Sequence, residues 1–347
     1  MQLFFSFVFS FLCSLGLTWL IRRNAVFFGF IDRPGAHKQH ADLTPTLGGI
    51  AIFGALLFSS LLYPMSSKTW VLLQASALVT VVGAVDDIRG VRATHKLFVL
   101  ALAACVLCEG NWPTGGPFQF PLNWILSFLW VGLVSSAFNG VDNADGAAGG
   151  LICISSLLCL LVGWVSGARH FESLMTSVAL AGACLGFLIF NFPNPRASIF
   201  LGDSGSLLIG LVISCLALDV VPQLDWWSFF FAGTLFAVPL FDFGLILILR
   251  GIKGQYSRWT DPITMCARDH TFHRLRAFGL TPRAAIYCMY LVALAIGLGA
   301  TLSWSILAQT GLEYYVYWVS LLAISGLVVL NQAPLAQDVY AEHRSVR

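Results

Sequence analysis

The sequence predicts an all-α, polytopic integral membrane protein, and its composition is the first observation that leads there. Of the 347 residues, 58% are hydrophobic and only 10% are charged. Soluble domains of ordinary size cannot bury that much apolar surface. The formal net charge is +2 and no run of like charges occurs, so nothing indicates nucleic-acid binding. Membrane lipid and small molecules are therefore the expected partners.

The second observation is the regular recurrence of long apolar segments. A spanning helix needs about 20 mostly apolar residues, and this rule predicts eleven spans in a single transmembrane domain, residues 1–330. A short cytoplasmic tail, residues 331–347, follows. The expected spans are 2–21, 47–63, 70–85, 97–108, 122–138, 149–166, 172–190, 205–221, 226–248, 284–303 and 314–330.

The third observation is the distribution of basic residues, because Lys and Arg accumulate in cytoplasmic loops. Seventeen of the 19 Lys and Arg residues fall on alternate loops, and only Lys68 and Arg169 fall on the others. We therefore expect the N-terminus outside, the C-terminus in the cytoplasm and an odd number of spans. The same count puts the acidic motifs discussed next at the cytoplasmic ends of their spans.

Two acidic motifs adjoin the third and eighth spans. Asp86 and Asp87 end the third span, and two adjacent like charges raise one pKa unless a cation or metal offsets them. The alternative is a pair of solvated acids with arginine partners in the loop. Asp203 precedes the eighth span, where it is either the cap of that helix or a metal ligand.

A third motif follows the fifth span. Asn139, Asp142 and Asp145 are spaced i, i+3, i+6, so on a helical turn they would lie along one side. Carboxylate and amide oxygens are the ligands that magnesium prefers, and magnesium usually binds one or two carboxylates together with substrate phosphates. A turn rich in Asn and Asp is the alternative interpretation.

Two inner loops carry basic and imidazole side chains suited to phosphate. Lys38 lies in the first of them, where it could hold phosphate oxygens or simply obey the positive-inside rule. In the last long loop, His270 and His273 are one helical turn apart and Arg268 is close by. Zinc binding is the alternative to phosphate binding for this loop, but the loop sequence has no clear third side chain that could coordinate zinc.

Two further features adjoin the spans. The segment 44–49 combines Pro with paired Gly at the start of a span, which predicts a backbone that approaches another segment closely. Asp242 lies inside the ninth span, and an ionisable residue within a span is a functional-site hypothesis by default.

In their order along the chain, these motifs resemble the polyprenyl-phosphate N-acetylhexosamine-1-phosphate transferases, which form glycosyltransferase family 4. The similarity covers roughly residues 31–285. Its parts are Asp32-Arg-Pro and Pro45-Thr-Leu-Gly-Gly, Asp86-Asp87, Phe138-Asn-Gly-Val-Asp-Asn-Ala-Asp-Gly, Phe200-Leu-Gly-Asp-Ser-Gly-Ser, Pro239-Leu-Phe-Asp, and the His loop with Gly279-Leu-Thr-Pro-Arg.

The resemblance implies a reaction. N-acetylhexosamine-1-phosphate, with GlcNAc-1-phosphate as the favoured case, moves from a UDP-sugar to undecaprenyl or another polyprenyl phosphate, and UMP is released. The implied cofactor is Mg²⁺, with Mn²⁺ as the alternative. The enzyme would lie in the bacterial inner membrane with its active site facing the cytoplasm, would initiate synthesis of a cell-surface polysaccharide, and could be a homodimer.

The resemblance also implies roles for single residues. The implied metal ligands are Asn139 and Asp203. The implied catalytic residues are Asp86, Asp87, His270 and His273, and the implied substrate-binding residues are Lys38, Asp142, Asp145, Phe200 and Arg268. The chain departs from the family pattern at Phe272, which stands where the family often has an imidazole.

Two alternatives stay open. Transfer of the larger phospho-MurNAc-pentapeptide is the runner-up within the enzyme class, since the segment 44–49 resembles that branch of the family. A transporter or flippase that uses Asp242 in a proton relay is the rival from another class. Acids gathered at one side of the membrane favour the enzyme over the transporter.

Overall fold

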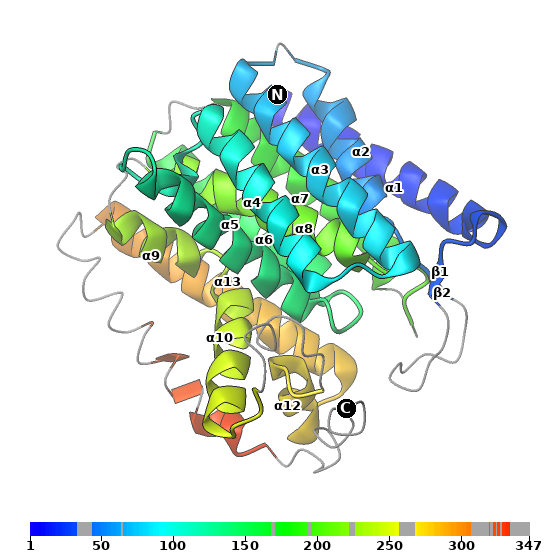
Figure 1. Ribbon diagram of the computed structural model, residues 1–347, viewed down its shortest axis with the longest axis vertical. Helices are drawn as coiled ribbons and strands as arrows, with labels where there is room; N and C mark the ends of the chain where they lie inside the picture. The colour runs from blue at the N-terminus through cyan, green and yellow to red at the C-terminus, as the bar shows by residue number, and fades with distance from the viewer. Residues whose placement is uncertain are drawn as a thin grey trace.

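The computed structural model describes residues 1–32, 44–63, 65–167, 171–192, 196–221, 226–256 and 268–306, and positions 319, 322–323, 325–326 and 328–333. Helices dominate these residues (Figure 1), which confirms the predicted all-α class. The elements are α1 (Gln2–Phe28), β1 (Ile31–Asp32), β2 (Thr44–Pro45), α2 (Gly48–Ser60), α3 (Ser67–Arg89), α4 (Ala93–Glu109), the 3₁₀ turn η1 (Pro113–Gly115), α5 (Leu122–Val141), α6 (Ala147–Val165), α7 (Phe171–Asn191), α8 (Gly202–Asp219), α9 (Trp226–Thr234), α10 (Ala237–Ile252), α12 (Thr271–Ala277) and α13 (Pro282–Ile306).

The helices have the length and apolarity of a polytopic membrane protein. Within the described residues, seven can cross a membrane, and the pair α9 and α10 makes an eighth if it counts as one span. Helix α2, with 13 residues, is shorter than a standard span. The expected span 314–330 lies largely outside the described residues, so the total of eleven spans and the orientation of the termini stay predictions.

The prediction of a continuous ninth span is wrong. Residues 226–248 were expected to form one helix, but α9 and α10 are separate and meet at a bend of 101°. Pro239, in the first turn of α10, explains the break. Its ring cannot donate a hydrogen bond and would clash with the carbonyl of Leu235 in a continuous helix, whereas the first turn of a new helix tolerates proline.

Helix α8 occupies the centre of the bundle, packed against α2, α3 and α5 (Figure 1). Glycines permit the closest approaches. A Cβ at Gly83 of α3 would lie 2.5 Å from the Ser204 Cα, and a Cβ at Gly49 of α2 would lie 2.1 Å from the Gly205 amide nitrogen. The prediction that segment 44–49 approaches another backbone is therefore confirmed.

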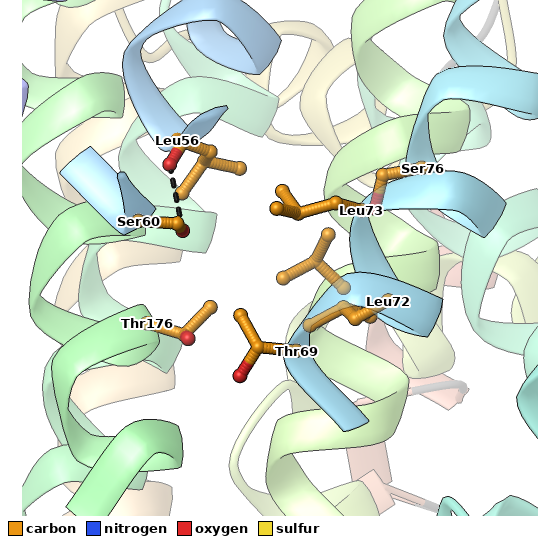
Figure 2. Close-up of a pocket in the computed structure, with 8 residues that line it drawn as sticks. Leu56, Ser60, Thr69, Leu72, Leu73, Ser76 and Thr176 are labelled. Carbon is orange, nitrogen blue, oxygen red and sulfur yellow. Dashed lines mark hydrogen bonds between the residues drawn. The ribbon is translucent and has the colours of Figure 1, made fainter. Parts of the chain in front are cut away.

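The bundle has two ends with different contents. We call the end where α3 and α5 finish and α8 begins the site end. A small cavity lies toward the opposite end, and its lining includes Leu56, Ser60, Leu73 and Thr176 (Figure 2). Ser76, the lining residue of α3 nearest to the site end, precedes Asp86 by 10 positions, about 15 Å at 1.5 Å per residue. The cavity is therefore separate from the acidic motifs.

Candidate functional site

A lysine joins two of the acidic motifs at the site end. The Lys96 ammonium, in the first turn of α4, lies 2.5 Å from Asp203 Oδ2 and 3.0 Å from Asp86 Oδ2. Asp86 ends α3 and Asp203 begins α8, so one cation connects three helices. The side chains of Asp86 and Asp203 remain 14% and 22% exposed, so both carboxylates are partly accessible to solvent. From the sequence alone, Lys96 is one of the basic residues that indicate topology.

The neighbouring acid, Asp87, caps helix α8. Its Oδ1 accepts the amide of Asp203 at 2.8 Å and its Oδ2 accepts the amide of Ser204 at 3.2 Å. Gly202 makes this approach possible, because it has φ of 73° and a Cβ there would lie 2.4 Å from Asp87 Oδ2. The alternative that Asp203 caps its own helix is wrong, since the N-cap position is Leu201. Asp203 is left available for cations.

The third acidic motif reaches the same cluster. Asn139 Nδ2 donates to Asp203 Oδ2 at 3.3 Å. Burial, and after it the negative charges of Asp203, Asp87 and Asp145, raises the pKa of Asp142 well above its usual range. The helix ends at Val141, so the motif runs from α5 into a turn and does not stay on one helical side. All three predicted acidic motifs therefore converge, as the sequence analysis expected.

Asp145 and Phe200 help to join the loops around this cluster. Asp145 Oδ2 accepts the amide of Ala197 at 2.9 Å. The Phe200 amide donates to the Pro45 carbonyl at 2.8 Å, and the Phe200 carbonyl accepts the Gly48 amide at 3.1 Å. The loop before α8 is thus fixed both to the end of α5 and to the start of α2.

The His loop borders the cluster from another side. The His270 Nδ1 atom lies 2.7 Å from Asp242 Oδ2, and a Cβ at Gly140 would lie 3.6 Å from His270 Cε1. Burial, and after it the charges of His270 and Arg268, lowers the pKa of His273 to about 4. His273 is therefore neutral at physiological pH, while Arg268 is exposed at the edge of the loop.

Not every residue singled out from the sequence can be placed at the site end. Lys38 lies outside the described residues. Phe272 packs against the hydrophobic core. The catalytic, metal-binding and substrate-binding roles inferred from the sequence stay predictions for every residue, although the structure brings most of these residues to one end of the bundle.

The donor set at the site end suits a hard divalent cation. Asp86 and Asp203 present carboxylate oxygens around a point that a Lys96 ammonium already occupies, so this position favours positive charge. Among the described residues, no three His, Cys, Asp or Glu side chains are grouped closely enough to hold a metal. Magnesium commonly takes only one or two protein carboxylates and completes its coordination with water and phosphate oxygens.

Fold and site together define a helical membrane protein with a mixed cluster of acids, lysine and imidazole at one end of its bundle. Comparison with known proteins identifies its family. The model of glycosyl transferase family 4 matches residues 69–221, which include Asp86, Asn139 and Asp203. With the similarity to full-length relatives described next, the chain belongs to this family, and the resemblance drawn from its motifs is confirmed.

The relatives are similar over most of their length. A probable undecaprenyl-phosphate N-acetylglucosaminyl 1-phosphate transferase of Bacillus subtilis is 30% identical, over 94% of this chain and 89% of the relative. A decaprenyl-phosphate N-acetylglucosaminephosphotransferase of Mycolicibacterium smegmatis is 31% identical, over 82% and 77%. An undecaprenyl-phosphate alpha-N-acetylglucosaminyl 1-phosphate transferase of Yersinia pestis is 27% identical, over 82% and 80%.

Proposed function

We propose that this protein transfers GlcNAc-1-phosphate from UDP-GlcNAc to a polyprenyl phosphate such as undecaprenyl phosphate, with release of UMP. The observation that carries the proposal is the convergence of Asp86, Lys96, Asn139 and Asp203 from four helices at one end of an apolar bundle. The relatives named above, which act on undecaprenyl or decaprenyl phosphate and N-acetylglucosamine by their names, support the same substrates.

The reaction exchanges one phosphoanhydride linkage for another. A non-bridging oxygen of the lipid phosphate forms a bond to the phosphorus that carries the sugar, and the P–O bond between that phosphorus and the UMP phosphate breaks. The displaced oxygen stays with UMP. Because both substrates are anions, the site must offset their repulsion and the charge that develops on the transferring group. The Lys96 ammonium stands in the cluster where that charge is expected.

Mg²⁺ is the proposed cofactor, with Mn²⁺ as the alternative. Asp203 and the amide oxygen of Asn139 would hold it, and when bound it would neutralise phosphate oxygens and orient them for displacement. Asp86 would then keep Lys96 within reach of the lipid phosphate. Asp87 contributes by holding the first turn of α8, and so Asp203, in place.

The remaining predicted residues are proposed to hold the nucleotide sugar. Asp142 and Asp145 follow the α5 terminus, and Phe200 lies in the loop that Asp145 fixes. Lys38 and Arg268 would add positive charge around the diphosphate. We propose further that this site faces the cytoplasm of a bacterial plasma membrane, as the basic-loop count indicates, and that the product initiates a cell-surface polysaccharide.

The test uses the purified full-length protein in detergent with undecaprenyl phosphate, Mg²⁺ and a panel of UDP-sugars. We expect UMP release and a lipid-extractable radiolabelled product with UDP-GlcNAc, loss of both on adding EDTA, and recovery with excess Mg²⁺. A product only with UDP-MurNAc-pentapeptide would replace the proposed donor by the runner-up. No product with any donor, together with solute uptake into proteoliposomes, would favour the transporter.

A further inference from the structure

Asp242 is a buried carboxylate that has no role in the reaction proposed above. It lies on α10, in the second half of the broken pair, and is 1% exposed. Its Oδ2 lies 2.7 Å from His270 Nδ1, and its Oδ1 accepts the Thr271 amide at 2.5 Å. Both carboxylate oxygens are therefore directed at two consecutive residues of the His loop.

Helix α10 holds the preceding residue of that loop as well. Arg250, two turns beyond Asp242, donates from Nε to Asp269 Oδ2 at 2.9 Å and from Nη2 to Asp269 Oδ1 at 2.6 Å. Burial alone would raise the pKa of Asp269, but the hydrogen bond and charge of Arg250 hold it below the usual range. The residues 269, 270 and 271 are thus all anchored to α10.

A second buried arginine, on α12, also holds this loop. Arg274, 1% exposed, donates from Nε to the Asp269 carbonyl at 2.6 Å and from Nη1 to the Leu330 carbonyl at 2.9 Å. Arg250 and Arg274 therefore both hold Asp269 by hydrogen bonds, Arg250 at the carboxylate and Arg274 at the carbonyl. The contact between Asp242 and the imidazole is an additional element with a separate consequence.

That consequence concerns the orientation and protonation of His270. A carboxylate that accepts from Nδ1 keeps the proton on that nitrogen and leaves Nε2 as the variable position. The ring carbon next to Nε2, Cε1, faces Gly140, which adjoins Asn139 in the acidic cluster.

We propose that Asp242 is a positioning residue of the transfer reaction, which fixes the His270 ring with Nε2 directed at the phosphates. The inference rests on the proposed function. If Asp242 is only structural, its replacement lowers the amount of folded protein and leaves the turnover of the folded fraction unchanged. If Asp242 positions His270, its replacement lowers the turnover of the folded protein, and it does so only while His270 is present.

The experiment is a double-mutant cycle with Asp242→Asn, His270→Gln and the double variant, with kcat and KM for UDP-GlcNAc measured per folded protein. We expect Asp242→Asn to lower kcat by about 10- to 100-fold and to change KM by less than about threefold. In the His270→Gln background, Asp242→Asn should have almost no further effect on kcat. Asp219→Asn, the same change in a buried acid at the opposite end, is the matched control for turnover.

Asp242→Glu completes the test, because it keeps the charge and lengthens the side chain by one methylene. We expect it to recover part of the turnover lost in Asp242→Asn, which also provides a readout if Asp242→Asn does not fold. Equal losses from Asp242→Asn with and without His270, or wild-type kcat in the folded variants, would overturn the inference while leaving the proposed function intact. An inactive wild-type protein would instead refute the proposed function and the inference with it.

Discussion

Both ends of the helix bundle hold a lysine beside acidic side chains, but the surroundings of the two lysines differ. At the opposite end, Lys68 pairs with Asp219, which is 4% exposed and also accepts from Ser173. The Trp112 ring covers the Lys68 ammonium at 4.6 Å from its centroid. At the site end, the Lys96 ammonium contacts two acids that stay partly exposed.

The difference indicates that the Lys68 end stabilises the fold, whereas the Lys96 end is the candidate site. Glu172 at the opposite end accepts from Ser66 and Thr69, so short hydroxyl side chains of neighbouring helices satisfy its charge. The side chain of Asp203 instead accepts hydrogen bonds from Lys96 and Asn139. In the proposed reaction, the Lys96 charge would act on phosphate oxygens and the Asn139 amide oxygen would bind the metal. The following predictions test this contrast.

The largest effect is expected from Asp203→Asn. The substitution keeps the shape of the side chain and removes the charge that would hold the metal, so kcat should fall by about 10³-fold or more, on the order of 4 kcal/mol of transition-state stabilisation. UMP release measures it. Asp219→Asn should retain at least half of the wild-type activity, and more than a tenth of wild-type activity in Asp203→Asn would contradict the role assigned to Asp203.

Lys96→Met should have the next largest effect. Methionine keeps much of the apolar stem and removes the ammonium between Asp86 and Asp203, so we expect kcat to fall by about 10²-fold. Lys68→Met is the matched control at the opposite end. Equal activity in the two variants would show that neither lysine acts on the substrates.

Asp219→Asn should instead lower stability. The variant loses an ion pair with Lys68 and weakens the contact to Ser173, at a cost of about 2 kcal/mol. The melting temperature in detergent should therefore fall by a few degrees. An unchanged melting temperature combined with lost activity would reverse the distinction between the two ends.

The smallest effect is a pH dependence at His273. The pKa of about 4 lies below that of an unfolded histidine, near 6.5. Between these values the unfolded chain binds a proton that the folded chain does not, so this residue makes stability fall as the pH decreases. In His273→Gln the loss of melting temperature between pH 7 and pH 5 should be smaller than in the wild type. The exposed His95, changed to Gln, provides the control, and identical losses in all three proteins would refute the prediction.

Much of the fold could be predicted because apolar segments of fixed length recur along the chain. The boundaries of α5 and α7 fall within a few residues of the expected spans. The break between α9 and α10 was missed although Pro239 marks it, because the hydropathy of residues 226–248 is continuous across the break. Local backbone sterics, and not hydropathy, determine the structure at that position.

The site was predictable in its membership but not in its contacts. Spacing and topology placed Asp86, Asn139 and Asp203 at one end of the bundle, which the structure confirms. Lys96 was overlooked because a single lysine in a basic loop is expected from topology alone. That Asp87 caps α8 could not be foreseen, since its two amide partners are more than 100 positions away in sequence.

The glycine contacts around α8 have a consequence for how this protein tolerates variation. Gly49 and Gly83 bring α2 and α3 into backbone contact with the first turn of α8, so any larger residue there would displace Asp203. In a saturation mutagenesis screen, these two positions should be as intolerant as the acids themselves, although neither has a functional group. Loss-of-function substitutions should therefore also occur at residues that do not contact a substrate.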